Sequence, residues 1–211
     1  MLEVASQTVG ILEENTYIVY RPDKQAILFD PGANPDCLLK WIKDNEWQVQ
    51  AIFLTHCHYD HIGALDAVRK DLNVAVYASV IEKEYFQDPV LNLSSTGPYE
   101  VICQPADYYW EHLGKQNIGD FDFEIRPVPG HSPGSLIYYF DADQLAISGD
   151  VLFKNSVGRT DLLGSNPFDL QKSLKDQVMT LPNEVMVCPG HGPVTTLGLE
   201  KETNPFLTTF I

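Results

Sequence analysis

Apolar positions in the first half of the chain alternate between two patterns, the compact runs of strands and the three-to-four-residue spacing of helices. Pro35 suits the first turn of a helix, and Ser79 suits a helix N-cap. Glycines and prolines between residues 89 and 115 predict a loop-rich segment. The strands expected in this half are 15–20, 25–30, 49–54 and 74–77, and the expected helices are 35–45, 64–72 and 79–86.

The second half of the chain repeats this alternation. Asn166 is expected to cap a helix that begins at Pro167. Two similar halves with mixed strands and helices predict an α/β fold, in which two sheets pack together with helices outside. The expected strands are 121–127, 135–140, 144–148 and 184–188, and the apolar face of the expected helix is Phe168, Leu170, Leu174 and Val178.

The composition is that of a globular protein, because 211 residues with 44% hydrophobic content can form one well-packed domain. We expect neither a membrane span nor a signal peptide, since no long apolar run and no basic leader are visible. A formal net charge of −15 argues against nucleic-acid phosphates as partners. The four cysteines lack CxxC spacing, and Cys37 and Cys188 lie among apolar residues, so we expect buried, reduced thiols and a cytoplasmic protein.

The stretch THCHYDH at 55–61 follows an apolar run and holds three of the six histidines of the chain. Imidazoles and carboxylates are costly to bury without partners, so core packing does not explain this cluster. His56 and His58 are two residues apart and point to the same side of an extended backbone. Asp60 and His61 follow as the chain turns into a helix. The cluster therefore predicts four metal ligands.

Three further donors, His131, Asp150 and His191, also follow predicted strands in glycine-rich turns. Any one of them alone would be an ordinary loop or turn residue, and His112 is interpreted as a surface histidine. Together with the 55–61 cluster they make seven donors. Seven are too many for one tetrahedral zinc but suit two metal ions that share a carboxylate.

These residues resemble the metallo-β-lactamase superfamily over nearly the whole chain, 1–211. The resemblance implies a four-layer αβ/βα sandwich with a dinuclear site. It assigns His56, His58 and His131 to a first metal, and Asp60, His61 and His191 to a second, with Asp150 bridging. Asp30 resembles a buried acid that orients the ligand loop. The motifs that carry the resemblance are LFDPG at 28–32, THCHYDHIGA at 55–64, PGHSPGS at 129–135, SGD at 148–150 and PGHG at 189–192.

Within the superfamily, GRTD at 158–161 and TTLGLEKETNPFL at 195–207 are similar to short glyoxalase II-like hydrolases. We expect a single metallo-β-lactamase-like domain over 1–211, without the C-terminal helical domain of full-length glyoxalase II. Arg159 is expected either to take a substrate carboxylate or to pair with Asp161. A secreted β-lactamase is disfavoured, because that class usually has cysteine in place of Asp150, and the nuclease branch usually has a large inserted domain.

The resemblance implies hydrolysis of a small-molecule thioester such as S-2-hydroxyacylglutathione, with Asp60 or Asp150 steering the proton of the attacking water. Zinc is the first expectation for both metals, with iron or manganese as alternatives. A rival class is the persulfide dioxygenases, which would use one iron on His56, His131 and Asp150. Hydrolysis of another ester or lactone, and metal storage without catalysis, are further alternatives.

Overall fold

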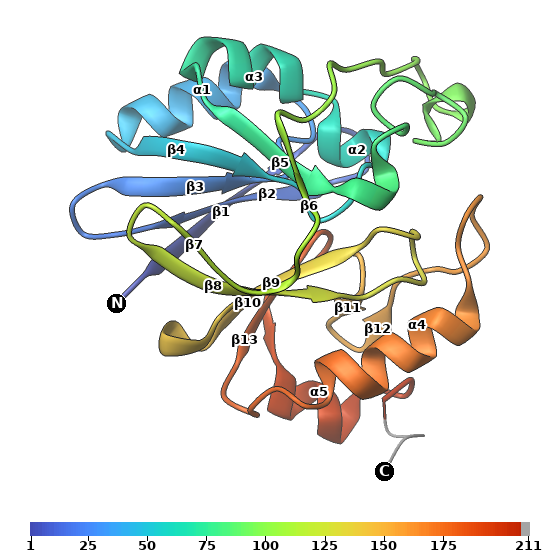
Figure 1. Cartoon of the computed structure of the whole chain (residues 1–211). Helices are drawn as coiled ribbons and strands as arrows, with labels where there is room; N and C mark the ends of the chain where they lie inside the picture. Colours follow the sequence, from blue (N-terminus) through green and yellow to red (C-terminus); the bar gives the residue numbers. More distant parts are fainter. Residues whose placement is uncertain (208–211) are drawn as a thin grey trace. The chain divides into compact units, whose positions relative to one another are not determined.

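The structure is a computed structural model that describes residues 1–207. The chain divides into two compact units, Met1–Glu111 (unit 1) and His112–Ile211 (unit 2). Each unit contains one six-stranded sheet, and helices cover one face of it (Figure 1). The α/β class predicted from the sequence is confirmed.

The sheet of unit 1 has the strand order β1-β2-β3-β4-β5-β6. β1, β2 and β3 pair antiparallel, whereas β3 to β6 run parallel. Because β3 and β4 are parallel neighbours, their C-terminal ends meet at one edge of the sheet. The elements are β1 (Glu3–Val9), β2 (Glu14–Tyr20), β3 (Gln25–Phe29), α1 (Pro35–Asp44), β4 (Gln48–Phe53), α2 (Tyr59–Ile62), α3 (Leu65–Leu72), β5 (Ala75–Ser79) and β6 (Tyr108–Trp110), with 3₁₀ turns at Val80–Glu82 and Ser94–Thr96.

The core of unit 1 lies between the sheet and the helices α1 and α3. Leu38 of α1 and Leu65 of α3 are fully buried against strand residues such as Leu28 and Ile52. Burial of each such side chain contributes about 1.5–3 kcal/mol to folding. This packing fixes the strands, and with them the loops that leave the sheet edge.

The sheet of unit 2 has the strand order β14-β13-β10-β9-β8-β7. Its strands pair antiparallel except for β10 and β13, which are parallel. The helices α4 and α5 cover one face of this sheet (Figure 1). The elements are β7 (Gly114–Ile118), β8 (Phe121–Pro127), β9 (Leu136–Phe140), β10 (Leu145–Gly149), β11 (Leu152–Phe153), β12 (Ser156–Val157), α4 (Pro167–Ser173) with a π-helical continuation (Leu174–Val178), β13 (Met186–Pro189), β14 (Thr195–Thr196) and α5 (Leu197–Thr203).

The predicted start of α4 is confirmed, because the Asn166 side chain accepts hydrogen bonds from the backbone N–H groups of Phe168 and Asp169. The predicted position of Phe168 on the buried face is wrong, since its side chain is 79% exposed. Leu170 and Leu174 lie one turn apart and set the buried face. Phe168 precedes Leu170 by two residues, which places it on the opposite side of the helix.

Other local predictions also need correction. The helix expected from Ser79 to Phe86 is only a 3₁₀ turn, although Ser79 does accept the N–H of Ile81. The two β-branched residues after Ser79 disfavour a longer helix. Strand β1 was not predicted, because it is an edge strand with a largely polar and part-exposed pattern. Cys37 is exposed, unlike Cys188, because it lies on the solvent side of α1.

Within the described part of the chain, the helices are too short and too polar to cross a bilayer.

Ile52→Ala should lower the free energy of unfolding by about 2–5 kcal/mol, because the side chain is fully buried in the core of unit 1. The measurement is urea denaturation followed by circular dichroism. Ile81→Ala is the matched control, since Ile81 is 62% exposed and should change stability little. Equal losses in the two variants would contradict this description of the core.

Candidate metal centre

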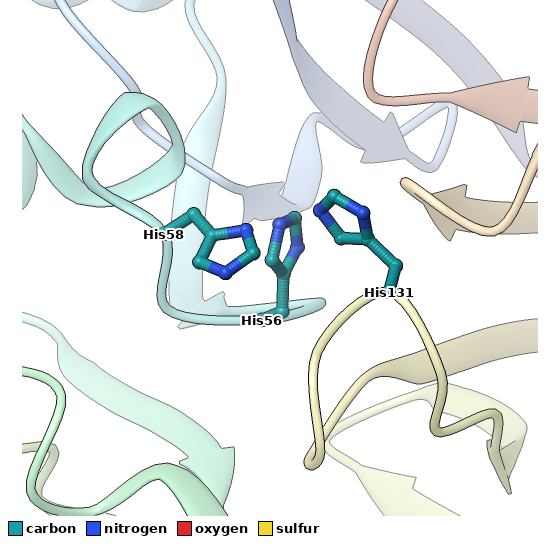
Figure 2. A group of neighbouring side chains, drawn as sticks. All are labelled: His56, His58 and His131. Atoms are coloured by element: carbon teal, nitrogen blue, oxygen red, sulfur yellow. The ribbon is translucent and has the colours of Figure 1, made fainter. Parts of the chain in front are cut away.

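The first donor group, which consists of His56, His58, Asp60 and His61, lies on the segment that follows β4. This segment leaves the C-terminal edge of the sheet between the parallel neighbours β3 and β5. The three histidines are at most 3% exposed, and Asp60 is part-buried. His56 and His58 come from this loop in Figure 2, which also draws His131 on the loop that follows β8.

The alternation of side chains along the extended loop separates the histidines from Cys57. Cys57 points into the hydrophobic core, and its backbone N–H donates to the buried carboxylate of Glu82 over 2.6 Å. The rings of His56 and His58 have centroids 4.7 Å apart, and those of His56 and His61 4.1 Å. His56 and His58 thus lie on the same side of the loop, as their two-residue spacing predicted, and His61 of α2 lies beside them.

The carboxylate of Asp30 holds this loop in place. Its Oδ1 accepts the N–H of Thr55 over 2.8 Å, and its Oδ2 accepts the Thr55 hydroxyl over 2.6 Å. The same Oδ2 lies 3.0 Å from Nδ1 of His61. Since a carboxylate only accepts, Nδ1 of His61 carries the proton and its Nε2 carries a lone pair.

His56 is oriented by the same chain of hydrogen bonds. The hydroxyl proton of Thr55 is directed at Asp30, so the Thr55 oxygen is left to accept from Nδ1 of His56 over 3.1 Å. Nε2 of His56 therefore also carries a lone pair. Metal-binding histidines typically donate their second N–H in this way, because the hydrogen bond fixes the ring and its tautomer.

Glu14 is a buried carboxyl group beside this network that the sequence interpretation missed. It is 1% exposed, accepts the Thr16 hydroxyl, and has Oε1 3.9 Å from Nδ1 of His61. Burial raises the pKa of Glu14 well above its usual value, with an opposing effect from the neighbouring His61 ring and a further rise from Asp30. Its place in a polar run at the start of β2 gave no sign of a partner in the 55–61 stretch.

Glu14, Asp30 and His61 bring three donor atoms within 4.8 Å of one another. They do not make a convincing metal trio, because Asp30 and His61 already share a hydrogen bond.

The second donor group consists of His131, Asp150 and His191. β10 and β13 are parallel, so Asp150 and His191 leave the sheet at the same edge. β8 pairs antiparallel with β9, and β9 with β10, so β8 runs in the direction of β10 and brings His131 to that edge. Oδ2 of Asp150 lies 3.5 Å from Nε2 of His131 and 3.5 Å from Nε2 of His191.

His131 is oriented through its other ring nitrogen, as His56 and His61 are. Nδ1 of His131 lies 3.0 Å from the carbonyl oxygen of Arg159, which can only accept. Nε2 of His131 therefore carries the lone pair and faces Asp150. A carbonyl is supplied by any residue type, so no sequence signal could have indicated this contact.

The side chain of Arg159 makes a bidentate ion pair with Asp161, at 2.7 and 2.8 Å. The sequence left open whether Arg159 takes a substrate carboxylate or pairs with Asp161, and the structure contains the pair with Asp161. The pairing lowers the pKa of Asp161 to about 2. Both side chains are mostly exposed, so the pair adds little to stability.

The donor types and spacings in both groups fit divalent metal ions. Two ligands bound at about 2.0–2.2 Å in a tetrahedral site lie roughly 3.3–3.6 Å apart. The Asp150 oxygen has this separation from both of its imidazole neighbours, and Asp60 Oδ2 lies slightly farther, 3.9 Å, from Nε2 of His61. Imidazole and carboxylate ligands are accepted by zinc, iron and manganese alike.

Asp30→Asn should lower the metal affinity of the protein by roughly 10–100-fold, because the amide NH₂ cannot accept the protons of Thr55 and His61. Metal content after dialysis against graded chelator is the measurement. Asp36→Asn makes the same change at an exposed position of α1 and should retain normal metal content. Unchanged retention in Asp30→Asn would show that Asp30 does not orient the donors.

The model of the metallo-beta-lactamase superfamily matches residues 9–191, which span both units. The probable metallo-hydrolase YqgX of Bacillus subtilis is 43% identical over 203 residues, which are 96% of this chain and 96% of that protein. The hydroxyacylglutathione hydrolase GloC of Haemophilus influenzae is 28% identical, over 95% of this chain and 96% of that protein.

Two crystal structures resemble the chain over nearly its whole length. The structure of the B3 metallo-beta-lactamase BLEG-1 superposes on this chain with a TM-score of 0.95 and 42% sequence identity. The match covers 98% of this chain and 100% of that chain. TTHA1623 in a di-iron-bound form has a TM-score of 0.86 and 38% identity, over 96% of this chain and 100% of that chain. The chain therefore belongs to the metallo-beta-lactamase superfamily, and each of its units contains a group of histidines and carboxylates whose donor atoms fit a metal ion.

Proposed function

We propose that this protein hydrolyses thioesters, with S-2-hydroxyacylglutathione as the reference substrate, and that the two donor groups together hold two divalent metal ions. The observation that carries the proposal is the position of Asp150, whose Oδ2 lies 3.5 Å from Nε2 of both His131 and His191. A carboxylate oxygen at this distance from two imidazoles fits a ligand that two ions share. The matched region of the family model contains all seven donors.

The proposed ligands of the first metal are His56, His58 and His131. Those of the second are Asp60, His61 and His191, with Asp150 shared. When bound, such ions supply Lewis-acid activation of water and of the thioester carbonyl. We propose zinc or iron as the metal. Iron is included because the similar protein TTHA1623 has a di-iron-bound form, and manganese is a further alternative.

Thioester hydrolysis requires three changes. The oxygen of water must bond to the carbonyl carbon, the carbon–sulfur bond must break, and the leaving sulfur must end with a proton. Asp60 and Asp150 are the carboxylates that can hold the proton of the attacking water. Asp30, Thr55 and the Arg159 carbonyl keep three imidazoles in the tautomer that presents Nε2.

Thioesters are favoured over other esters by the likeness to GloC, a hydroxyacylglutathione hydrolase, over almost the whole chain. The glyoxalase II-like stretches at 158–161 and 195–207 support the same choice. β-Lactam hydrolysis is the second candidate, because the structure of the metallo-beta-lactamase BLEG-1 has a TM-score of 0.95 with this chain. Persulfide oxidation with one iron is a third candidate, and the contact of His191 with Asp150 favours a complete second site over it.

His58→Ala should reduce turnover of S-lactoylglutathione by more than roughly 100-fold. Loss of a residue that only hydrogen-bonds a metal ligand costs up to about that factor, and loss of a ligand itself should cost more. The unaltered, metal-loaded protein should reach about 10⁴ M⁻¹s⁻¹ or more in kcat/KM, measured as loss of thioester absorbance. His112→Ala replaces an exposed histidine and should retain full activity. Metal content and circular dichroism of both variants exclude unfolding as the cause.

Full turnover by His58→Ala with normal metal content would sink the metal assignment. If the metal-loaded protein leaves S-lactoylglutathione and other thioesters intact, the thioester proposal fails. Hydrolysis of a chromogenic cephalosporin, or oxygen consumption with glutathione persulfide, would then identify the second or third candidate.

A further inference from the structure

Unit 2 contains a pocket of about 560 Å³ beside the second donor group. Its volume lies within the ~300–1,000 Å³ that is usual for small-molecule sites. One wall is the segment 157–160, a second is α4 with its π-helical continuation, and a third is the C-terminal segment 205–206. The lining residues include Gly158, Arg159, Thr160, Leu170, Gln171 and Phe206.

Two walls of the pocket, the segment 157–160 and α4, also contact the second donor group or its loops. The carbonyl oxygen of Arg159 accepts a hydrogen bond from Nδ1–H of His131 over 3.0 Å. A Cβ on Gly158 would lie 2.0 Å from the carbonyl oxygen of Asp150, so this wall passes directly against a proposed ligand. A ligand in the pocket would therefore lie one backbone segment away from His131 and Asp150.

α4 is tied equally closely to the His131 loop. A Cβ on Gly130 would lie 2.3 Å from the backbone nitrogen of Leu170, so the helix and the loop are in backbone contact. Asn166 N–H donates to the carbonyl of Gly130 over 2.7 Å, and the Ser173 hydroxyl donates to the carbonyl of Pro129 over 2.8 Å. The position of the pocket relative to His131 is thus fixed by several independent contacts.

The third wall is held by a buried carboxylate. Glu200 is 0% exposed and accepts from the Thr195 hydroxyl, the Asn155 N–H and the Asn204 side-chain amide. The Asn204 side chain in turn accepts the N–H of Phe206 over 3.0 Å. This network holds Phe206 at the rim, where its ring is 49% exposed. An aromatic ring kept at the mouth of a pocket is suited to contact a ligand.

The lining favours an uncharged ligand. Most of the side chains are apolar, and Thr160 and Gln171 add neutral hydrogen-bonding groups. Arg159 is the one cation among the described lining residues, and its guanidinium is already bound at two points by Asp161. Glutathione carries two carboxylates, which would lose hydration here without gaining a free cation, in a chain of net charge −15.

We propose that this pocket binds the thiol-carrier arm of the substrate, and that the arm it fits is uncharged, amide-bearing and mostly apolar, as in a pantetheine thioester. The inference rests on the proposed thioester hydrolysis and names its substrate class more closely. The carrier arm is the part assigned to the pocket because a small 2-hydroxyacyl group such as lactoyl cannot fill about 560 Å³. Glutathione thioesters would then be accepted more weakly than neutral ones.

The first test measures binding without turnover, using the unreactive thioethers S-methylpantetheine and S-methylglutathione with the metal-loaded protein in a calorimeter. S-methylpantetheine should bind with a Kd roughly tenfold or more below that of S-methylglutathione. Gln171→Trp should raise the Kd of S-methylpantetheine by a similar factor. Gln171 is solvent-exposed and lines the pocket, so the larger indole would occupy space that the ligand needs. Phe206→Ala should also raise this Kd, through loss of the rim ring.

Phe168→Ala is the matched control, since Phe168 is 79% exposed on the same helix and does not line the pocket. It should leave both Kd values unchanged. Equal or tighter binding of S-methylglutathione would overturn the proposal. So would S-methylpantetheine binding that survives both Gln171→Trp and Phe206→Ala in folded protein.

Hydrolysis of matched lactoyl thioesters separates this inference from the proposed function. A kcat/KM for S-lactoylpantetheine above that for S-lactoylglutathione, with the difference reduced in Phe206→Ala through KM, would support the carrier-arm assignment. A preference for S-lactoylglutathione would overturn it while leaving thioester hydrolysis intact. Absence of hydrolysis of either compound, with pocket binding of S-methylpantetheine retained, would overturn the thioester function instead.

Discussion

The hydrogen bonds of the Asp30 carboxylate are the interaction on which the first donor group depends. A buried carboxylate is stable only if its oxygens are satisfied, and here the N–H and hydroxyl of Thr55 and the ring of His61 supply the donors. These contacts set the tautomer of His61 directly and that of His56 through Thr55. One side chain that follows β3 thereby aligns two imidazoles of the loop that follows β4.

Strand direction supplies the rest of the geometry. In both units the donor loops leave parallel-running strands at their C-terminal ends, so residues far apart in sequence reach the same sheet edge. In unit 2, Asp150 and His191 are 41 positions apart but follow the parallel pair β10 and β13. A hydrogen bond from Gly190 N–H to the carbonyl of Gly149 then holds the two loops in register.

The sequence was a good guide wherever the signal is local. The strands expected at 15–20 and 25–30, the Asn166 cap and the gathering of the histidines in the 55–61 stretch depend on residues close together in the chain. Glu14 could not be predicted as a neighbour of His61, because their contact is long-range. The orientation of His131 by the Arg159 carbonyl leaves no side-chain signature, and β1 is too polar to read as a strand.

The two roles of segment 157–161 explain why Arg159 was ambiguous from sequence alone. Its backbone carbonyl orients His131, a role that any residue type could fill, whereas its side chain is engaged by Asp161 at the surface. The guanidinium is therefore already bound at two points, and a substrate carboxylate could use it only by displacing Asp161. In the proposed carrier-arm pocket, recognition is therefore assigned to the apolar walls formed by α4 and Phe206, which would select by shape and by absence of charge.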